Sequence, residues 1–291
     1  MTEYITGKTK LLCVIGSPVA HSISPQMHNE AIRLLGLDYV YTAFDVPKEK
    51  IADALKSLAL LGAAGCNVTM PGKIIAAQIA DELSDAARLC GAANTVVFRD
   101  GRMIADTTDG IGFMRSAERL GVSLKGKKLS VLGAGGAAKA IIVQAALDGV
   151  SEIEIFRRKG AAFAETEEFA ARVADETNAK ILVTDSGDFA ALKAGVRESA
   201  ALVNGTNVGM NPDPDGCLIP DETYFAPGMF VCDIIYDPVE TKLMRLAKEA
   251  DCKVCGGKSI LLFQGVASFQ EFTGHEAPVD DLITNVFHDE F

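Results

Sequence analysis

Positive charge is scarce in this sequence. Its 28 lysine and arginine residues face 39 aspartate and glutamate residues, which gives a formal net charge of −11 at pH 7. A surface that binds nucleic acid or an anionic membrane normally carries a positive excess. We therefore expect neither partner, and any anionic ligand must be bound by local positive groups.

Long apolar runs and targeting signals are also lacking. No run reaches membrane-spanning length, and the N-terminus lacks the charged, apolar and cleavage regions of a signal peptide. We therefore expect a cytoplasmic protein. With 48% hydrophobic and 23% charged residues, the 291-residue chain has the composition of an ordinary soluble protein and is long enough for two domains.

The seven cysteines form no metal-binding framework. Cys252 and Cys255 make a C-x-x-C pair, but no second pair or histidine cluster accompanies them, as a structural zinc site would need. The pair flanks two residues that are typical of a strand, whereas a redox motif should lie at a strand-to-helix turn. We expect reduced thiols and no metal site.

A strand, a glycine turn and an alanine-rich helix follow one another over residues 129–140. Gly133, Gly135 and Ala138 fit the G-x-G-x-x-G/A spacing of a dinucleotide-binding turn. The first glycine permits a tight turn, the second lets the backbone approach a pyrophosphate, and the small third residue lets the helix pack on its strand. The helix N-terminus then offers N–H groups to phosphates. A tight strand–helix turn without a ligand is the alternative.

Positive charge gathers at Arg157, Arg158 and Lys159, after the second strand of this half. An NAD site usually carries Asp or Glu there for the ribose 2′-hydroxyl, whereas Arg accommodates a 2′-phosphate. A guanidinium can meet a phosphate with two hydrogen bonds and can stack on adenine. The sequence favours NADP, with NAD as the alternative cofactor and a solvated basic turn as the interpretation without one.

Strands and helices also alternate before residue 100, which predicts an open, mostly parallel α/β sheet. Ser22 and Ser24 follow the first strand, and Thr69 and Lys73 follow a later one. Ligands bind at the carboxyl ends of strands in such sheets, so we expect both segments to face one crevice. Taken singly, Ser24 could cap a helix and Lys73 could be a surface lysine.

Asn94 and Asp109 flank a predicted hairpin that turns at Asp100 and Gly101. The hairpin explains neither residue, although Asp109 could cap a helix over residues 111–120. A polar linker over residues 125–128 then leads to the glycine turn. We expect a domain boundary between residues 110 and 125.

Together these segments resemble the shikimate/quinate dehydrogenase family, in particular its quinate/shikimate branch. The shared motifs are Gly16-x-Pro18-x-x-His21-Ser22-x-Ser24-Pro25-x-x-His28-Asn29, Asn67-Val68-Thr69-x-Pro71-x-Lys73, Gly91-Ala92-x-Asn94-Thr95, Thr108-Asp109-Gly110, Asn204-Gly205-Thr206-Asn207-Val208-Gly209-Met210, Asp233-x-x-Tyr236-x-Pro238 and Gln264-Gly265. They span almost the whole chain in matching order. The resemblance implies an oxidoreductase of aromatic amino acid biosynthesis that moves a hydride between NAD(P) and a ring alcohol of shikimate or quinate.

The resemblance also implies a fold. An N-terminal open α/β substrate domain would be followed by a doubly wound Rossmann domain and by a C-terminal helix that returns to the first domain. Residues 1–115 and 257–291 would bind substrate and carry catalysis, and residues 116–256 would bind NAD(P). This division explains why the glycine turn lies in mid-chain. For the oligomeric state, a monomer and a homodimer are both compatible with the sequence.

Roles for single residues follow by matched position. Lys73 and Asp109 would form the catalytic pair, with Lys73 as the base in oxidation and the proton donor in reduction. The substrate would be bound by Ser22, Ser24, Thr69, Asn94, Asp109, Tyr236 and Gln264, of which the two serines would hold its carboxylate. The cofactor would be bound by Gly133, Ala134, Gly135, Gly136, Ala137, Arg157, Arg158, Thr206, Asn207 and Gly257.

Three positions depart from the family's pattern. Thr107 stands where the family usually has Asn, Ile260 stands where it has Met, and Gly160 replaces an aspartate of the quinate/shikimate branch. The loss of that acid supports NADP. Two other interpretations are open: a non-catalytic NADP-binding regulatory homologue, against which the presence of Lys73 and Asp109 argues, and a dehydrogenase of another small hydroxy acid, which would lack the Ser-x-Ser loop.

Overall fold

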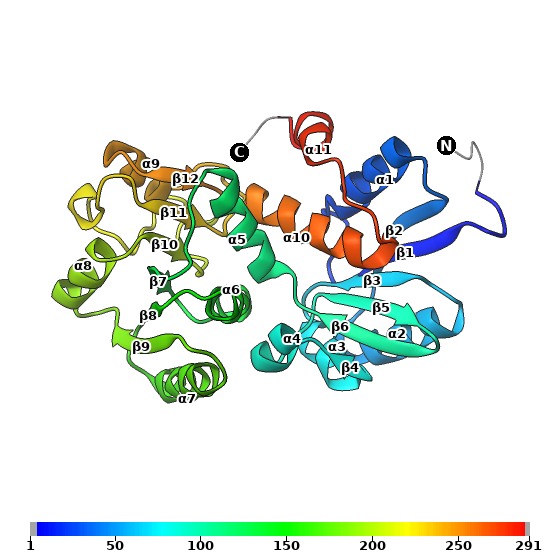
Figure 1. Cartoon of the computed structure of the whole chain (residues 1–291), viewed down its shortest axis with the longest axis horizontal. Coiled ribbons are helices and arrows are strands. Elements are labelled where there is room, and N and C mark those ends of the chain that lie inside the picture. The colour runs from blue at the N-terminus through cyan, green and yellow to red at the C-terminus, as the bar shows by residue number, and fades with distance from the viewer. Residues whose placement is uncertain (1–4, 289–291) are drawn as a thin grey trace. The chain divides into compact units, whose positions relative to one another are not determined.

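The computed structural model describes residues 5–288 and divides into two compact units. The first unit contains the residues up to Thr108 together with those from Gln264 onward, and the second contains Asp109–Phe263. Within the described residues each unit is built on a six-stranded sheet (Figure 1). The outermost residues of the predicted first domain, 1–4 and 289–291, lie outside the described residues.

The first unit has a mixed sheet with the strand order β2-β1-β3-β5-β6-β4. Its strands are β1 (Lys10–Gly16), β2 (Tyr39–Asp45), β3 (Gly65–Val68), β4 (Glu82–Leu83), β5 (Thr95–Arg99) and β6 (Arg102–Asp106). β1 is parallel to β2 and β3, and β4 is parallel to β6, whereas β5 runs antiparallel to both of its neighbours. The predicted hairpin is confirmed, because Asp100 (φ 52°) and Gly101 (φ 75°) supply the two positive φ angles of a tight two-residue turn.

Short helices cover this first sheet. They are α1 (Ser24–Leu35), η1 (Lys48–Lys50), α2 (Ile51–Leu60), α3 (Lys73–Ile79), α4 (Asp85–Cys90) and α11 (Val279–Asn285). Apolar side chains of the sheet and the helices, among them Ile15, Leu55 and Val68, form one buried cluster. The chain passes from the second unit back into the first within one helix, α10 (Gly257–Thr273).

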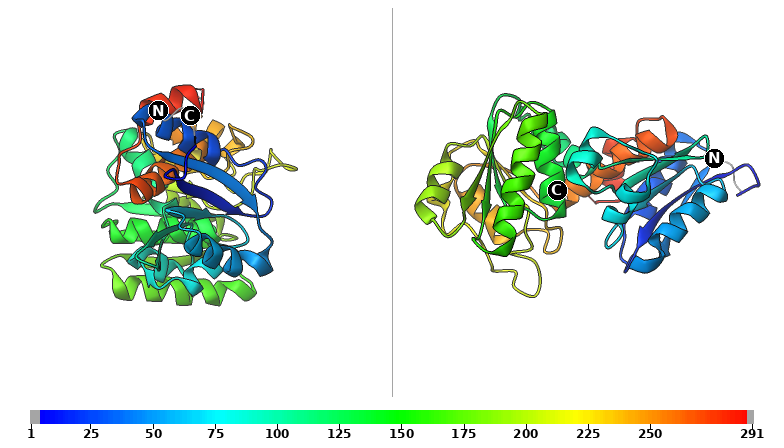
Figure 2. Two further views of the ribbon diagram at one scale, coloured as in Figure 1. Left: turned by 90° about the vertical axis from the view of Figure 1, so that its right-hand side faces the viewer. Right: turned by 90° about the horizontal axis from the view of Figure 1, so that it is seen from below.

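The second unit has an all-parallel sheet with the order β12-β11-β10-β7-β8-β9. Its strands are β7 (Lys128–Leu132), β8 (Glu152–Arg157), β9 (Lys180–Asp185), β10 (Ala201–Asn204), β11 (Phe230–Asp233) and β12 (Lys253–Cys255). Its helices are α5 (Asp109–Arg119), α6 (Gly136–Leu147), α7 (Ala161–Glu176), α8 (Phe189–Arg197), η2 (Glu222–Tyr224) and α9 (Lys242–Glu249). The chain starts in the middle of the sheet, winds outward to one edge and then to the other, and helices lie on both faces (Figure 2, right). This is the doubly wound arrangement that the sequence predicted.

All seven cysteines are free thiols, as expected. Cys252 directly precedes strand β12 and Cys255 is its last residue. The Cys255 sulfur lies 3.1 Å from that of Cys232 on the neighbouring strand. Burial raises the pKa of the Cys232 thiol well above its usual value, which keeps it protonated and unreactive. Within residues 5–288, no helix is both long enough and apolar enough to cross a membrane.

Candidate active site

The loops after β1 and β3 lie together in the first unit because these two strands are parallel neighbours. The Ser17 N–H donates to the Met70 carbonyl at 3.0 Å, which ties one loop to the other. Gly16 allows this close approach, since a side chain there would clash with Thr69. The structure therefore brings the loop after β1, which leads to Ser22 and Ser24, next to the segment from Thr69 to Lys73, as the sequence predicted.

Ser22 and Ser24 lie at the start of helix α1. The Ser24 N–H donates to the Ser22 hydroxyl at 3.3 Å, and both side chains are half-buried. The helix already includes Ser24 and has no side-chain cap, so the interpretation of Ser24 as the N-cap is wrong. Burial raises the pKa of the Tyr41 phenol well above its usual value, and the Ser24 hydroxyl lowers it in part. With no acid in the first helical turn, the two hydroxyls lie where an anion is favoured.

Asn67 connects three elements behind these loops. Only 7% exposed, it accepts a hydrogen bond from the Tyr41 phenol at 2.8 Å. Its amide nitrogen donates to the Asn94 carbonyl at 3.1 Å and to the Ser268 hydroxyl at 3.0 Å. A buried polar group is stable only when it is hydrogen-bonded in this way, so Asn67 fixes β2, β3 and α10 to one another.

Asn94 is the centre of the predicted hydroxyl-binding residues. It is 3% exposed, and its amide oxygen accepts the Thr108 N–H at 2.8 Å and the Thr95 hydroxyl at 3.0 Å. Its amide nitrogen donates to the Gln264 side-chain oxygen at 3.2 Å and to the Thr108 hydroxyl at 3.0 Å. Two residues separated by 170 positions, both predicted to bind ring hydroxyls, are therefore in direct contact.

Lys73 is the first residue of helix α3, and its side chain is half-buried. Its carbonyl accepts the N–H of Ala93 at 2.9 Å, which places Lys73 next to the segment that carries Asn94. The helix dipole disfavours a cation at a helix N-terminus. The helix dipole therefore does not explain the lysine at this position.

Several polar residues of this network were not predicted as site residues: Tyr41, Asn67, Thr95, Thr108 and Ser268. Ser268 lies one turn after Gln264 on α10, and its hydroxyl donates to the Gln264 carbonyl at 3.0 Å. That i, i+4 spacing is a signal in the sequence that could have identified it. Tyr41 carries no such signal, because its partners lie on other elements.

In the second unit, the glycine turn joins β7 to α6. Gly133 has φ 88°, and a side chain there would come within 2.5 Å of Thr206. A Cβ at Gly136 would meet no other atom within 4 Å, so there is room for a ligand at the helix N-terminus. No side chain caps α6 and its first turn holds no acid. These features fit the pyrophosphate of a dinucleotide.

A second polar cluster supports the loops beside this turn. The Thr206 hydroxyl donates to the Asn204 oxygen at 2.7 Å, and the Asn204 amide donates to Asp233 at 3.0 Å. Asp233 is fully buried and also accepts the Ile235 N–H and the Thr241 hydroxyl. Burial raises the pKa of Asp233, and these hydrogen bonds lower it in part. The sequence did not predict that Asp233 anchors the loop leading to Tyr236.

Arg157 ends β8 and Arg158 follows it. In the part of the chain that the structure describes, neither has an acidic side chain within ion-pair distance. The nearby carboxylate of Asp185 is engaged by backbone instead, accepting the N–H groups of Gly187 at 3.0 Å and Lys159 at 3.2 Å. The Gly187 bond above all, with that of Lys159, lowers the pKa of Asp185. Both guanidinium groups are thus available for a phosphate.

The predicted site residues divide between the units. Ser22, Ser24, Thr69, Lys73, Asn94 and Gln264 belong to the first, and Asp109, Tyr236 and all the predicted cofactor residues belong to the second. Asp109 is the first residue of α5, a position where the helix dipole favours an acid. Packing alone accounts for Gly257, because a Cβ there would clash with the Ile234 carbonyl. The Lys73–Asp109 pairing and the Gly257 cofactor contact therefore stay predictions.

Among residues 5–288, no group of three or more His, Cys, Asp and Glu side chains is arranged to hold a metal ion. The donor sets described above are amides, hydroxyls and one lysine in the first unit, and backbone N–H groups with arginines in the second. Such sets suit a neutral or anionic organic ligand and a dinucleotide.

Comparison with known proteins identifies the family. Residues 14–96 match the family model of the shikimate dehydrogenase substrate binding domain. The chain is 42% identical to the NADP(+)-dependent shikimate dehydrogenase of Streptococcus uberis, over 100% of this chain and 99% of that one. The structure of shikimate 5-dehydrogenase from Listeria monocytogenes with shikimate and NAD has a TM-score of 0.94 and 41% identity, covering 99% of each chain. The Thermus thermophilus enzyme with NADP(H) and shikimate has a TM-score of 0.82 and 31% identity, covering 97% of this chain and 100% of that one. The chain belongs to the shikimate dehydrogenase family.

Proposed function

We propose that the protein is an NADP-dependent shikimate dehydrogenase, which interconverts 3-dehydroshikimate plus NADPH and shikimate plus NADP. The observation that carries this proposal is the buried contact of Asn94 with Gln264 and Thr108, next to the segment that begins at Lys73. A ring with several hydroxyls needs donors and acceptors that are already oriented, and this network orients them. Relatives whose names state the same activity support the proposal.

Substrate binding is assigned to residues of the first unit, together with Asp109 and Tyr236 of the second. Ser22 and Ser24 hold the substrate carboxylate at the start of α1, where two hydroxyls and the helix N-terminus favour an anion. The ring hydroxyls contact four residues, Thr69, Asn94, Asp109 and Gln264. Tyr236, which is 49% exposed, lies near the substrate and the nicotinamide.

Proton transfer is assigned to Lys73 and Asp109. In the direction of reduction, the Lys73 ammonium donates a proton to the oxygen that becomes the ring hydroxyl, and in oxidation the Lys73 amine accepts that proton. Asp109 stabilises the ammonium and orients it. The ammonium nitrogen is therefore the atom at which this chain moves the proton.

NADP is assigned to the second unit. Bound there, it supplies or accepts the hydride at its nicotinamide ring. Gly133, Ala134, Gly135, Gly136 and Ala137 hold the pyrophosphate with backbone N–H groups. Arg157 and Arg158 bind the 2′-phosphate, while Thr206, Asn207 and Gly257 line the remainder of the cofactor. NAD, which lacks that phosphate, is the alternative cofactor.

The functional domains proposed are residues 1–115 with 257–291 for substrate and catalysis, and residues 116–256 for NAD(P). The compact units change at 108/109 and 263/264, so Asp109 is carried by the unit with the glycine turn. A cytoplasmic location, the absence of a nucleic-acid partner and a monomeric or dimeric state stay predictions from the sequence.

The test is an assay of the purified protein with shikimate or quinate and with NADP or NAD, followed by nicotinamide absorbance. We expect shikimate to reduce NADP fastest. The Lys73→Ala variant, purified in the same way, controls for contaminating dehydrogenases. No reduction in any of the four combinations would contradict the proposed function, and faster reduction of NAD would contradict the cofactor assignment alone.

A further inference from the structure

Two adjacent residues of helix α1 hold Tyr41 of strand β2. The Asn29 amide donates to the Tyr41 carbonyl at 2.8 Å and accepts the Tyr41 N–H at 2.9 Å. The His28 ring stacks on the Tyr41 ring, with their centroids 4.2 Å apart and their planes inclined by 4°. Both the backbone and the ring of Tyr41 are therefore fixed to α1, the helix that begins at Ser24.

His28 contributes through its ring and not through a hydrogen bond. The side chain is buried, and neither ring nitrogen has a hydrogen-bond partner among the described residues. The pocket that the described residues form beside it, lined in part by Met27 and Phe269, is too small for a water molecule. Burial lowers the pKa of His28 to about 3, so the ring is neutral near pH 7. What remains for this imidazole is the packing of its ring.

Helix α10 encloses the other side of the imidazole. The ring centroids of Phe269 and Phe272 lie 5.9 and 6.2 Å from that of His28. Gly265 permits this close approach of α10 to α1, since a Cβ there would clash with the end of the Met27 side chain. Aromatic pairs at such distances have preferred orientations, so the imidazole is held in place between Tyr41 and α10.

Tyr41 passes this placement on to the substrate network. Its phenol donates to the side-chain oxygen of Asn67 at 2.8 Å. The Asn67 amide nitrogen donates to the Asn94 carbonyl at 3.1 Å and to the Ser268 hydroxyl at 3.0 Å. All four residues are buried, so a group left unpaired in this chain of contacts would be costly. A continuous series of contacts thus joins helix α1 to Asn94.

We propose that Tyr41 is a positioning residue of the substrate site, which fixes the spacing between the start of α1 and Asn94. The inference rests on the proposed function, since it concerns the same site. The substrate carries its carboxylate and its hydroxyls on one ring, so it contacts Ser24 and Asn94 together only at the right spacing. Tyr41 acts through Asn67, and its phenol therefore matters for shikimate and not for NADP.

The first experiment uses Tyr41→Phe, which keeps the ring that stacks on His28 and removes the donor to Asn67. We expect KM for shikimate to rise about three- to tenfold, the value of one hydrogen bond. KM for NADP should be unchanged and kcat should stay within about twofold, because the interaction lost serves binding alone. Tyr39→Phe, two residues earlier on the same strand, is the matched control. Its hydroxyl accepts an exposed hydrogen bond of 3.5 Å from Lys10, and this variant should behave as the wild type does.

A double-mutant cycle tests the route through Asn67. Once Asn67→Ala has removed the acceptor, Tyr41→Phe should raise KM for shikimate by less than about twofold further. A general loosening of the fold would instead make the two effects multiply. The cycle therefore separates a role through Asn67 from a merely structural role of Tyr41.

The stack is tested by a pair of substitutions at His28. His28→Phe keeps an aromatic ring and removes two unpaired nitrogens, so its melting temperature should not fall below that of the wild type and KM for shikimate should be unchanged. His28→Leu removes the ring and should raise KM for shikimate about two- to tenfold, the value of an aromatic pair.

One measurement needs no catalysis. Amide hydrogen exchange of the ligand-free protein should be faster over residues 92–96 in Tyr41→Phe than in the wild type, because Asn67 holds the Asn94 carbonyl less firmly. Tyr39→Phe should exchange at the wild-type rate.

The outcomes are distinct. Equal KM values for shikimate in an active wild type and in Tyr41→Phe would overturn the positioning role, and so would multiplying effects in the cycle with Asn67. If Tyr41→Phe did not fold, the His28 pair would decide: a KM that rises in His28→Leu alone supports the inference, and any other pattern overturns it. A wild type that is inactive with shikimate would refute the proposed function. Hydrogen exchange would then still decide whether Tyr41 holds the segment of Asn94, and an unchanged rate in Tyr41→Phe would contradict it.

Discussion

The two units present polar groups in contrasting ways. In the first, Asn67 and Asn94 are almost completely buried, and their amides bond to other side chains and to backbone. In the second, the start of α6 has no side-chain cap, the space at Gly136 is open, and Arg157 and Arg158 have no ion-pair partner among the described residues. In the first unit the polar groups are already hydrogen-bonded within the protein, and in the second unit the start of α6 and Arg158 are exposed and Arg157 is partly exposed.

This difference follows from what each unit is proposed to recognise. Discrimination among ring hydroxyls depends on where each donor and acceptor points, and a buried network fixes those directions at a high cost for any unpaired group. A pyrophosphate and a 2′-phosphate instead need space and positive potential, which the N–H groups at a helix N-terminus and arginine side chains supply. Substitutions should therefore have different consequences in the two units, and we order them by their expected effect on turnover.

The largest effect is expected from Lys73→Ala in the first unit. Loss of the proton-transfer group should lower kcat by about 10²- to 10⁴-fold, because general acid–base catalysis contributes about that much. NADP affinity, measured by fluorescence titration, should be unchanged. Lys56→Ala, an exposed lysine of the same unit, is the control. Near-normal turnover of Lys73→Ala would refute the catalytic assignment.

The glycine turn offers a matched pair in the second unit. Gly136→Val places a side chain in open space, so the free energy of unfolding should change by less than about 0.5 kcal/mol. NADP binding should nevertheless weaken about a hundredfold, because the side chain occupies the pyrophosphate position. Gly133→Ala should instead destabilise the fold by about 1–3 kcal/mol, given its φ of 88° and the contact with Thr206. If Gly136→Val bound NADP normally, the pyrophosphate would not lie at this turn.

Arg157→Ala and Arg158→Ala test whether these two arginines of the second unit recognise the 2′-phosphate of NADP. Each should raise KM for NADP about ten- to a hundredfold, the value of a charge-assisted hydrogen bond, and should change KM for NAD little. Lys127→Ala, an exposed cation of the same unit, is the control. Equal effects on NADP and NAD would show that neither arginine recognises the 2′-phosphate.

Local rules account for what the sequence predicted well. The Asp100–Gly101 hairpin, the glycine turn before α6 and helix α10 each depend on residues close together in the chain. The loops after β1 and β3 could be placed together because parallel neighbouring strands end at the same edge of a sheet.

Long-range contacts account for what could not be predicted. The hydrogen bond of Asn67 to Ser268 joins residues 201 positions apart, and nothing near Asn67 in the sequence points to that partner. Tyr41 likewise is held by Asn29 of α1 and Asn67 of β3, which lie 12 and 26 positions away in the sequence. Ser24, whose position before a proline suggested a cap, is instead the first residue of α1, which has no side-chain cap. Such roles depend on how the elements assemble.

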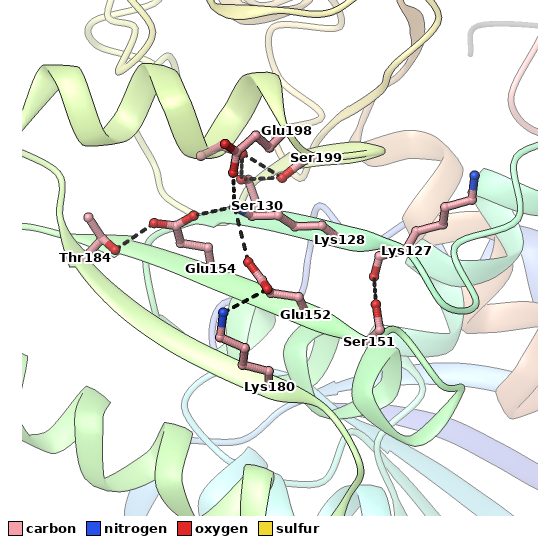
Figure 3. A network of polar contacts seen from close by, with 11 residues as sticks. Lys127, Lys128, Ser130, Ser151, Glu152, Glu154, Lys180, Thr184, Glu198 and Ser199 are labelled. Carbon is pink, nitrogen blue, oxygen red and sulfur yellow. Dashed lines mark hydrogen bonds and ion pairs between the residues drawn. The ribbon is translucent and has the colours of Figure 1, made fainter.

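A closed network also exists in the second unit, beneath helix α8 (Figure 3). The Lys128 ammonium lies 2.9 Å from Glu154, 3.2 Å from Glu198 and 3.3 Å from Glu152. Glu154 is 8% exposed and also accepts the Thr184 hydroxyl at 2.7 Å. Burial alone would lower the pKa of Lys128, but the three carboxylates, Glu154 foremost, raise it. The difference between buried and exposed polar groups therefore applies to the proposed ligand sites of the two units, because the second unit also has a buried polar network elsewhere.

Lys128→Met sharpens this point and should have the smallest effect on turnover. It leaves Glu154 buried beside two other carboxylates, so the free energy of unfolding in urea should fall by about 3 kcal/mol. Lys180→Met removes an ion pair to Glu152 from a largely exposed lysine and should cost less than about 1 kcal/mol. Both variants should keep the wild-type KM for shikimate and NADP, because the glutamates touch no proposed ligand residue. If Lys128→Met changed the KM for NADP, the ion-pair network beneath α8 would also position the loops that bind the cofactor. Stability and ligand binding would then depend on the same residues in this unit.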